Sequence, residues 1–236
     1  MKRWVSFAIL GGLVLAALLI PAGRSVALAQ SAAEPMITDG DFERNVSNRM
    51  LRTQESPRGW FESRHDKKGR ALLMLSKKRV GGNATKKAML KADAAGNAYL
   101  SQKLREPQTG RFTLQWDLYV KQILSKPNRA GYQMIGGDTV KKAPGPNATG
   151  AERFVFLAFE NAAAPGKVNL VALEDGSTTP PKSRVLVADL PAKKWLTIRV
   201  DVDVPGKSYQ VSVPGHTTAP VAAKAFVSKE KTVPSE

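Results

Sequence analysis

The sequence predicts an all-β protein, a two-sheet antiparallel β-sandwich of the jelly-roll type that follows an N-terminal signal peptide. Apolar and polar residues alternate along several segments, and the chain after the first 29 residues has no segment with helical periodicity. A single open sheet would leave an apolar face in water, so many antiparallel strands in one domain imply two packed sheets. An apolar leader that ends in a cleavage pattern predicts export.

The leader has the three parts of a secretory signal peptide. Lys2 and Arg3 give it a positive start, an apolar run covers residues 4–20, and Ala27-Leu28-Ala29 forms the small-x-small pattern that signal peptidase accepts. An uncleaved membrane anchor is the alternative. We predict cleavage because Pro21 ends the apolar run just before that pattern. The mature protein is therefore expected in the periplasm or outside the cell, with no stable membrane span.

The remaining chain is long enough for one large β domain. We predict a flexible mature N-terminus at residues 30–37, a jelly-roll domain at 38–228 and a charged tail at 229–236. Cysteine is absent, which excludes disulfides, thiolate metal sites and a cysteine nucleophile. Stability must then come from packing, even in an oxidising compartment.

The chain is strongly basic, with a formal net charge of +16. The excess is uneven, because residues 44–91 contain fourteen Lys and Arg but only three acidic residues. Such a field attracts polyanions, either acidic polysaccharide, lipid headgroups or nucleic acid. Nucleic acid is the weakest candidate, since no recognised nucleic-acid motif accompanies the charge. A solvated basic surface without a specific ligand is the alternative.

The clearest strand lies at residues 111–121, where Phe112, Leu114, Trp116, Leu118 and Val120 share one face. We expect Trp116, in this apolar stripe, to belong to the core. The same alternation recurs at 195–203, and residues 204–207 are predicted to form a type II turn, with positive φ at the glycine, that leads into a strand at 209–213. Further strands are predicted at 86–94, 98–105, 132–136, 153–160, 167–174 and 183–189.

Three segments resemble a known superfamily. Asp39-Gly40-Asp41-Phe42-Glu43, followed by Pro57-Arg58-Gly59-Trp60, resembles the opening of many secreted jelly-roll domains. The segments 98–102 and 110–120 resemble a pair of strands in such domains, and 195–203 with 209–213 is similar to a hairpin of concanavalin A-like lectin/glucanase domains. The resemblance covers most of residues 38–215 and implies a curved jelly roll whose concave face often holds a saccharide.

Galactose-binding-like carbohydrate modules share the opening pattern and are the alternative resemblance. In those modules the Phe-Glu carboxylate often joins a late-strand Asp pair at a structural calcium ion, and this chain lacks such a pair. Asp39, Asp41 and Glu43 are nevertheless hard oxygen ligands of the kind that calcium prefers. A solvated strand start is the alternative for these residues, and no other cofactor is predicted.

Sugar binding requires flat aromatic faces and planar polar groups. The polar faces of the strands at 111–121 and 195–203 supply both, with Tyr119 and Trp195 as predicted stacking residues and Arg199 as the partner of an acidic group. A plain solvated sheet surface is the alternative. The predicted ligand-binding residues are Gln115, Asp117, Tyr119, Trp195, Arg199 and Asp201.

Catalytic patterns are missing from the sequence. Glycosidases on concanavalin A-like folds commonly carry Glu-x-Asp-x-x-Glu on one strand. No such string occurs here, and the nearest pair on one strand face is Asp201 and Asp203. No nucleophile elbow or His-Glu-x-x-His occurs either. The sequence therefore favours a secreted or periplasmic carbohydrate-binding protein, with acidic polysaccharides as the candidate ligands. A polysaccharide lyase or glycoside hydrolase on the same fold, and a basic cell-envelope structural protein that holds an anionic polymer, are the alternatives.

Overall fold

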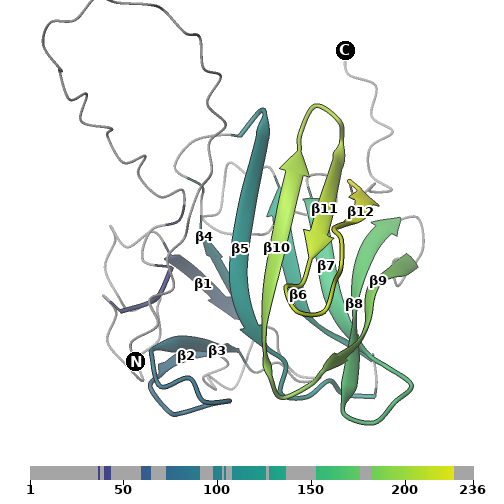
Figure 1. The fold of residues 1–236 in the computed structure, drawn as a ribbon. Helices are drawn as coiled ribbons and strands as arrows, with labels where there is room; N and C mark the ends of the chain where they lie inside the picture. The colour runs from purple at the N-terminus through teal and green to yellow at the C-terminus, as the bar shows by residue number, and fades with distance from the viewer. Residues whose placement is uncertain are drawn as a thin grey trace, which may run out of the picture.

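The computed structural model describes residues 37, 40–43, 60–64, 73–90, 98–102, 104, 108–125, 128–136, 153–175 and 182–225. The predicted signal peptide, nearly all of the predicted flexible N-terminus and the predicted tail lie outside these residues. The described residues form strands and their connections (Figure 1). They include no helix that is long and apolar enough to cross a bilayer.

Two four-stranded antiparallel sheets form the body of the protein and confirm the predicted β-sandwich (Figure 1). The first sheet has the order β12 (Val221–Lys224), β11 (Ser208–Ser212), β10 (Trp195–Asp203) and β5 (Arg111–Tyr119). The second has the order β6 (Arg129–Gly136), β7 (Arg153–Asn161), β8 (Lys167–Asp175) and β9 (Lys182–Pro191).

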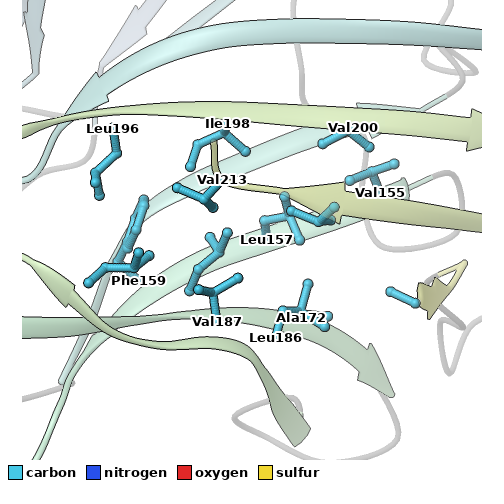
Figure 2. Close-up of a cluster of buried hydrophobic side chains, with 14 of the residues drawn as sticks. Val155, Leu157, Phe159, Ala172, Leu186, Val187, Leu196, Ile198, Val200 and Val213 are labelled. Carbon is cyan, nitrogen blue, oxygen red and sulfur yellow. The ribbon is translucent and has the colours of Figure 1, made fainter. Parts of the chain in front are cut away.

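The core lies between these two sheets. β10 contributes Leu196, Ile198, Val200 and Val202, which alternate with polar residues and are at most 3% exposed. Figure 2 shows Leu196, Ile198 and Val200 facing the side chains of β7, such as Val155, Leu157 and Phe159. The apolar stripe of β5 packs against the same core through Phe112, Trp116 and Leu118, which confirms the predicted core position of Trp116.

β7 and β8 are buried on both faces. Phe156, Ala158, Val171 and Leu173 point away from the main core and form a second buried cluster. This burial explains why residues 154–159 read as a continuous apolar run, since alternation is expected only where one face of a strand meets water.

Two smaller sheets lie beside β5. β1 (Trp60–Arg64) pairs with β4 (Ala98–Gln102), and β2 (Leu73–Ser76) pairs with β3 (Lys87–Leu90). Leu75 is fully buried among Phe42, Ala88 and Leu100, so segments far apart in the sequence share a small core. The rings of Phe42 and Trp60 lie 5.1 Å apart and join the two opening motifs of the sequence.

The predicted hairpin is confirmed, but the predicted type II turn is wrong. Val200 pairs with Val211 across β10 and β11, and the amide of Lys207 donates to the carbonyl of Val204 at 3.1 Å. Lys207 has the positive φ, 46°, and Gly206 does not. Glycine is needed at 206 for space, because a Cβ there would lie 2.9 Å from Cγ of Asp203, whose carboxylate accepts the Gly206 N–H.

The other predicted strands correspond to β3, β4 and β6 to β9, with bounds that differ by a few residues. β1, β2 and β12 were not predicted. β2 has a run of apolar residues without alternation, and β12 consists of Val-Ala-Ala-Lys, whose alanines give little strand signal. These strands exist because of the partners that they pair with.

Arg184 connects the two large sheets at one end of the sandwich, because it pairs with its own sheet and also donates a hydrogen bond to the other. Nη2 of Arg184 on β9 lies 2.7 Å from Oε1 of Glu174 on β8, and the same nitrogen donates to the carbonyl of Ala222 on β12 at 2.8 Å. The hydrogen bond from Arg184 is the main cause that lowers the pKa of Glu174. This pair is consequently expected to be charged down to acidic pH.

Replacing Ile198 with alanine should test the core. Ile198 is fully buried between the sheets, so Ile198→Ala should lower the free energy of unfolding by about 2–5 kcal/mol through lost burial and a cavity. Urea denaturation followed by circular dichroism measures this. Gln210→Ala, at an exposed position of neighbouring β11, is the control and should change stability by less than about 0.5 kcal/mol. Equal effects of the two substitutions would contradict the proposed core.

The Glu174–Arg184 pair should make stability depend on acid. The folded-state pKa of Glu174 is lowered, so its contribution is fully present above the ordinary value of 4.5 and is lost as the pH falls through the folded-state pKa. Urea denaturation at a series of pH values from neutral to acidic should show a loss of stability that is smaller in Glu174→Gln. Identical pH dependence in the two proteins would contradict this role.

Candidate functional site

The pairing of β5 with β10 brings the six predicted ligand-binding residues together. Trp195 lies opposite Tyr119, Asp117 opposite Thr197, and Arg199 opposite Gln115. Asp201 follows on the same face because alternate residues of a strand share a face. This face is opposite to the one that carries Leu196 and Ile198 into the core. The β5–β10 polar face consists of Thr113, Gln115, Asp117, Tyr119, Trp195, Thr197, Arg199 and Asp201.

The carboxylates of the β5–β10 polar face are already hydrogen-bonded. Thr197 Oγ1 donates to Asp117 Oδ1 at 2.7 Å. Asp201 accepts hydrogen bonds from Thr113 Oγ1 and from the guanidinium of Arg199, whose Nη2 lies 2.9 Å away. Three of the planar groups that the sequence analysis assigned to a ligand, those of Asp117, Arg199 and Asp201, are therefore already engaged on this face.

Neither Asp201 nor Asp203 is suited to donate a proton at neutral pH. Burial alone would raise the pKa of Asp201, but hydrogen bonds from Arg199 and Thr113 bring it below its ordinary value. The pKa of Asp203 is lowered by the backbone N–H of Gly206 and then by Arg111, whose Nη2 lies 2.9 Å away. A glycosidase needs one carboxyl held protonated, which is the opposite condition.

The aromatic end of the polar face is partly covered. The rings of Tyr119 and Trp195 lie 5.5 Å apart at 52°, and the indole Nε1 of Trp195 donates to the carbonyl of Val80 at 2.8 Å. Val80 and Gly81 lie between β2 and β3, so this turn packs on both rings. A Cβ at Gly81 would lie 2.7 Å from Cε2 of Tyr119. The rings are half-buried, and only their remaining surface is available for stacking.

Sequence reasoning did not foresee the group of cations around this aromatic end. Arg79 precedes Val80, Lys121 follows β5, and the backbone N–H of Lys193 donates to the carbonyl of Val120 at 2.9 Å, just before Trp195. Within the part of the chain that the structure describes, no ion pair neutralises these side chains. The basic cluster consists of the exposed residues Lys77, Lys78, Arg79, Lys121, Lys193 and Lys194. The charge run at 77–79 was visible in the sequence, but its position was not.

The predicted calcium ligands gain no support from the local geometry. Asp39 lies outside the described residues, and Asp41 Oδ1 accepts the backbone N–H of Glu43 at 3.1 Å. Glu43 Oε1 accepts the backbone N–H of Lys86 at 3.0 Å, and the Lys86 ammonium lies 3.9 Å from Oε2. A cationic neighbour fits a calcium ligand poorly. No group of three His, Cys, Asp or Glu side chains converges among the described residues.

The outer face of the second sheet carries a separate polar network. Nη2 of Arg129 on β6 lies 2.5 Å from Oε1 of Glu160 on β7, and Ser183 on β9 donates to the same oxygen at 3.0 Å. β6 and β9 are the edges of this sheet, about 14 Å apart if it were flat, yet Arg129 also donates to Ser183 at 3.2 Å. This face is therefore concave. Arg129 and Glu160 pair with each other, so this network connects the strands of its sheet. The predicted ligand-binding residues lie on the other sheet.

Comparison of the chain with protein-family models, with curated proteins and with solved structures finds no match.

The contact between Trp195 and the turn can be tested by hydrogen exchange. Trp195→Phe keeps an aromatic ring beside Tyr119 but removes the donor to the Val80 carbonyl, at a cost of about 1 kcal/mol. The amides of Val80 and Asn83, which bond to each other's carbonyls, should then exchange faster with deuterium. In the control Trp116→Phe, the indole N–H has no partner among the described residues, and these amides should keep their rates. Unchanged exchange in Trp195→Phe would disprove the anchoring contact.

Proposed function

We propose that this protein binds an acidic polysaccharide on the surface formed by the basic cluster and the β5–β10 polar face. The observation that supports this most is the position of the basic cluster. Exposed cations come from three separate segments whose backbones lie next to Tyr119 and Trp195, and no ion pair neutralises them in the described part of the chain.

Charge is distributed unequally along this surface. At the end of β10 near the turn at 204–207, Asp203 pairs with Arg111 and Asp201 with Arg199. At the other end the basic cluster has no such partners among the residues that the structure describes. Carboxylate or sulfate groups of a polymer would be attracted to the basic cluster, because unpaired cations concentrate anions and form charge-assisted hydrogen bonds with them.

The aromatic end and the polar face offer contacts that a sugar can use. The exposed parts of the Tyr119 and Trp195 rings provide apolar surface for the C–H groups of a pyranose. Gln115, on the same face, carries an amide that can donate to and accept from hydroxyl groups. The predicted export of the protein and the resemblance to concanavalin A-like domains agree with a polymer found outside the cytoplasm.

The carboxylates of Asp201 and Asp203 favour a protein that binds the polysaccharide without cleaving it. Both Asp201 and Asp203 have a lowered pKa, so neither would serve as the protonated acid of a glycosidase at neutral pH. A hydrolase therefore receives no support from these two carboxylates. The other alternative, a structural protein that holds any anionic polymer by charge alone, is separated from the proposal by experiment.

The test is a panel of purified acidic and neutral polysaccharides, with inorganic polyphosphate as a non-sugar polyanion, measured by calorimetry at low and at physiological salt. We expect binding to an acidic polysaccharide that exceeds binding to polymers of equal charge density. If every polyanion binds equally well and salt abolishes the binding, only the alternative of a structural protein that holds anionic polymers by charge would remain. No binding to any polymer at low salt would refute the proposal.

Reversing charge in the basic cluster should weaken binding. The double variant Lys121→Glu/Lys194→Glu should bind the selected polysaccharide about tenfold more weakly, because two attractive surface contacts become repulsive. The matched control Lys182→Glu/Lys207→Glu makes the same change in net charge at two exposed lysines outside the basic cluster. Lys182 begins β9, and Lys207 lies in the turn that follows β10. Equal losses of affinity in both variants would show that net charge, not this surface, determines binding.

A further inference from the structure

We propose that Gly81 is a positioning residue for the basic cluster. Gly81 allows the β2–β3 turn to pack against Tyr119 and Trp195. This contact holds the loop lysines and Arg79 beside the other residues of the basic cluster. This inference rests on the proposed function. It adds that Gly81 aligns the β2–β3 loop with the β5–β10 part of the binding surface. Gly81 itself need not touch the polysaccharide.

Hydrogen bonds within the loop between β2 and β3 stabilise its conformation. Val80 and Asn83 exchange backbone hydrogen bonds of 3.1 and 2.9 Å, and the side-chain oxygen of Asn83 accepts from both the amide and the hydroxyl of Thr85. The amide of Lys78 donates to Ser76 Oγ at 3.1 Å. The backbone that carries the loop cations is therefore fixed within the loop, although their side chains are exposed.

A buried ammonium stabilises the same loop from inside. Lys87 at the start of β3 is 8% exposed, and its Nζ donates to the carbonyls of Ser76, Lys78 and Thr85. All three donor sites of an ammonium are thereby used. Burial lowers the pKa of Lys87, an effect that the charge of Glu43 opposes. Lys87 thus connects the two ends of the loop and does not belong to the exposed basic cluster.

The docking of this loop on the sheet depends on the missing side chain at position 81. An added Cβ would lie 2.7 Å from Cε2 of Tyr119, closer than such atoms approach in proteins, and 3.0 Å from Cδ1 of Trp195, which is tighter than most such contacts. Next to this contact, the Val80 carbonyl accepts from the indole of Trp195. The loop consequently touches the sheet at the point where both the aromatic rings and Lys194 are located.

The neighbouring residue Gly82 supplies a matched control. Gly81 has φ +52° and Gly82 has φ +85°, so alanine brings backbone strain of the same kind at both positions. Nothing lies within 4 Å of an added Cβ at Gly82. Only the substitution at Gly81 should therefore lift the loop from the sheet. A rigid loop that is fixed to the sheet presents its cations without further ordering cost, and a detached loop does not.

The experiment compares Gly81→Ala and Gly82→Ala in binding the polysaccharide selected by the panel, over a series of salt concentrations. Gly81→Ala should bind about tenfold more weakly, and its logarithmic salt dependence should be shallower, because fewer cations contact the polymer at once. Gly82→Ala should bind within about twofold of the wild type and keep its slope. A loss of general stability alone would not change the slope.

The exchange rate of the Trp195 indole N–H, followed by NMR without ligand, reports docking directly and should rise in Gly81→Ala only. If the indole exchanges faster while affinity and slope stay at wild-type values, the positioning role of Gly81 is refuted and the proposed function stands. If Gly82→Ala loses as much affinity as Gly81→Ala, the role is refuted as well. Failure of the wild-type protein to bind any polymer would overturn the proposed function and the positioning role with it.

Discussion

The antiparallel pairing of β5 with β10 is the interaction on which the rest of the structure depends. Its register runs from Trp195 opposite Tyr119 to Asp203 opposite Arg111 without a bulge. Because side chains alternate between faces, this one register places Leu196 and Ile198 in the core and the polar residues outside. A slip by one residue would bury the charges and expose the core, so packing and the candidate site are fixed by the same set of hydrogen bonds.

Electrostatics then divides the outer face into two parts. The two aspartates of the polar face accept hydrogen bonds from Thr113, Thr197 and Arg199, and Asp203 beside this face pairs with Arg111. The lowered pKa of Asp201 and Asp203 keeps both charged. Paired charges attract a distant ligand weakly, whereas the basic cluster has no such partners among the described residues. The chemistry available to a ligand is therefore concentrated at the aromatic end, although the polar residues extend along the whole ladder.

The small layer formed by β1 to β4 partly covers the aromatic end of the polar face. Without it, Tyr119 and Trp195 would be two exposed rings on a sheet surface. With the β2–β3 turn in place, the Trp195 indole is bonded to Val80, Gly81 packs on both rings, and the loop cations stand beside them. The buried Lys87 ammonium helps this cation-rich loop to keep one conformation, because backbone carbonyls accept hydrogen bonds from that charge inside the loop. Lys77, Lys78 and Arg79 remain exposed.

The sequence by itself determined the strands with strict alternation. In β5 and β10 a period of two assigns each side chain to a face, which is why Trp116 was placed in the core and Gln115, Asp117, Tyr119, Arg199 and Asp201 were grouped correctly as outward residues. Only the tertiary structure decided that these two strands are direct neighbours, that Lys207 and not Gly206 takes the positive φ, and that Gly81 seats a basic loop on Trp195. Local periodicity reports which face a residue occupies. It carries no information on which distant segment packs there, since that choice is made by burial and hydrogen bonding across the whole chain.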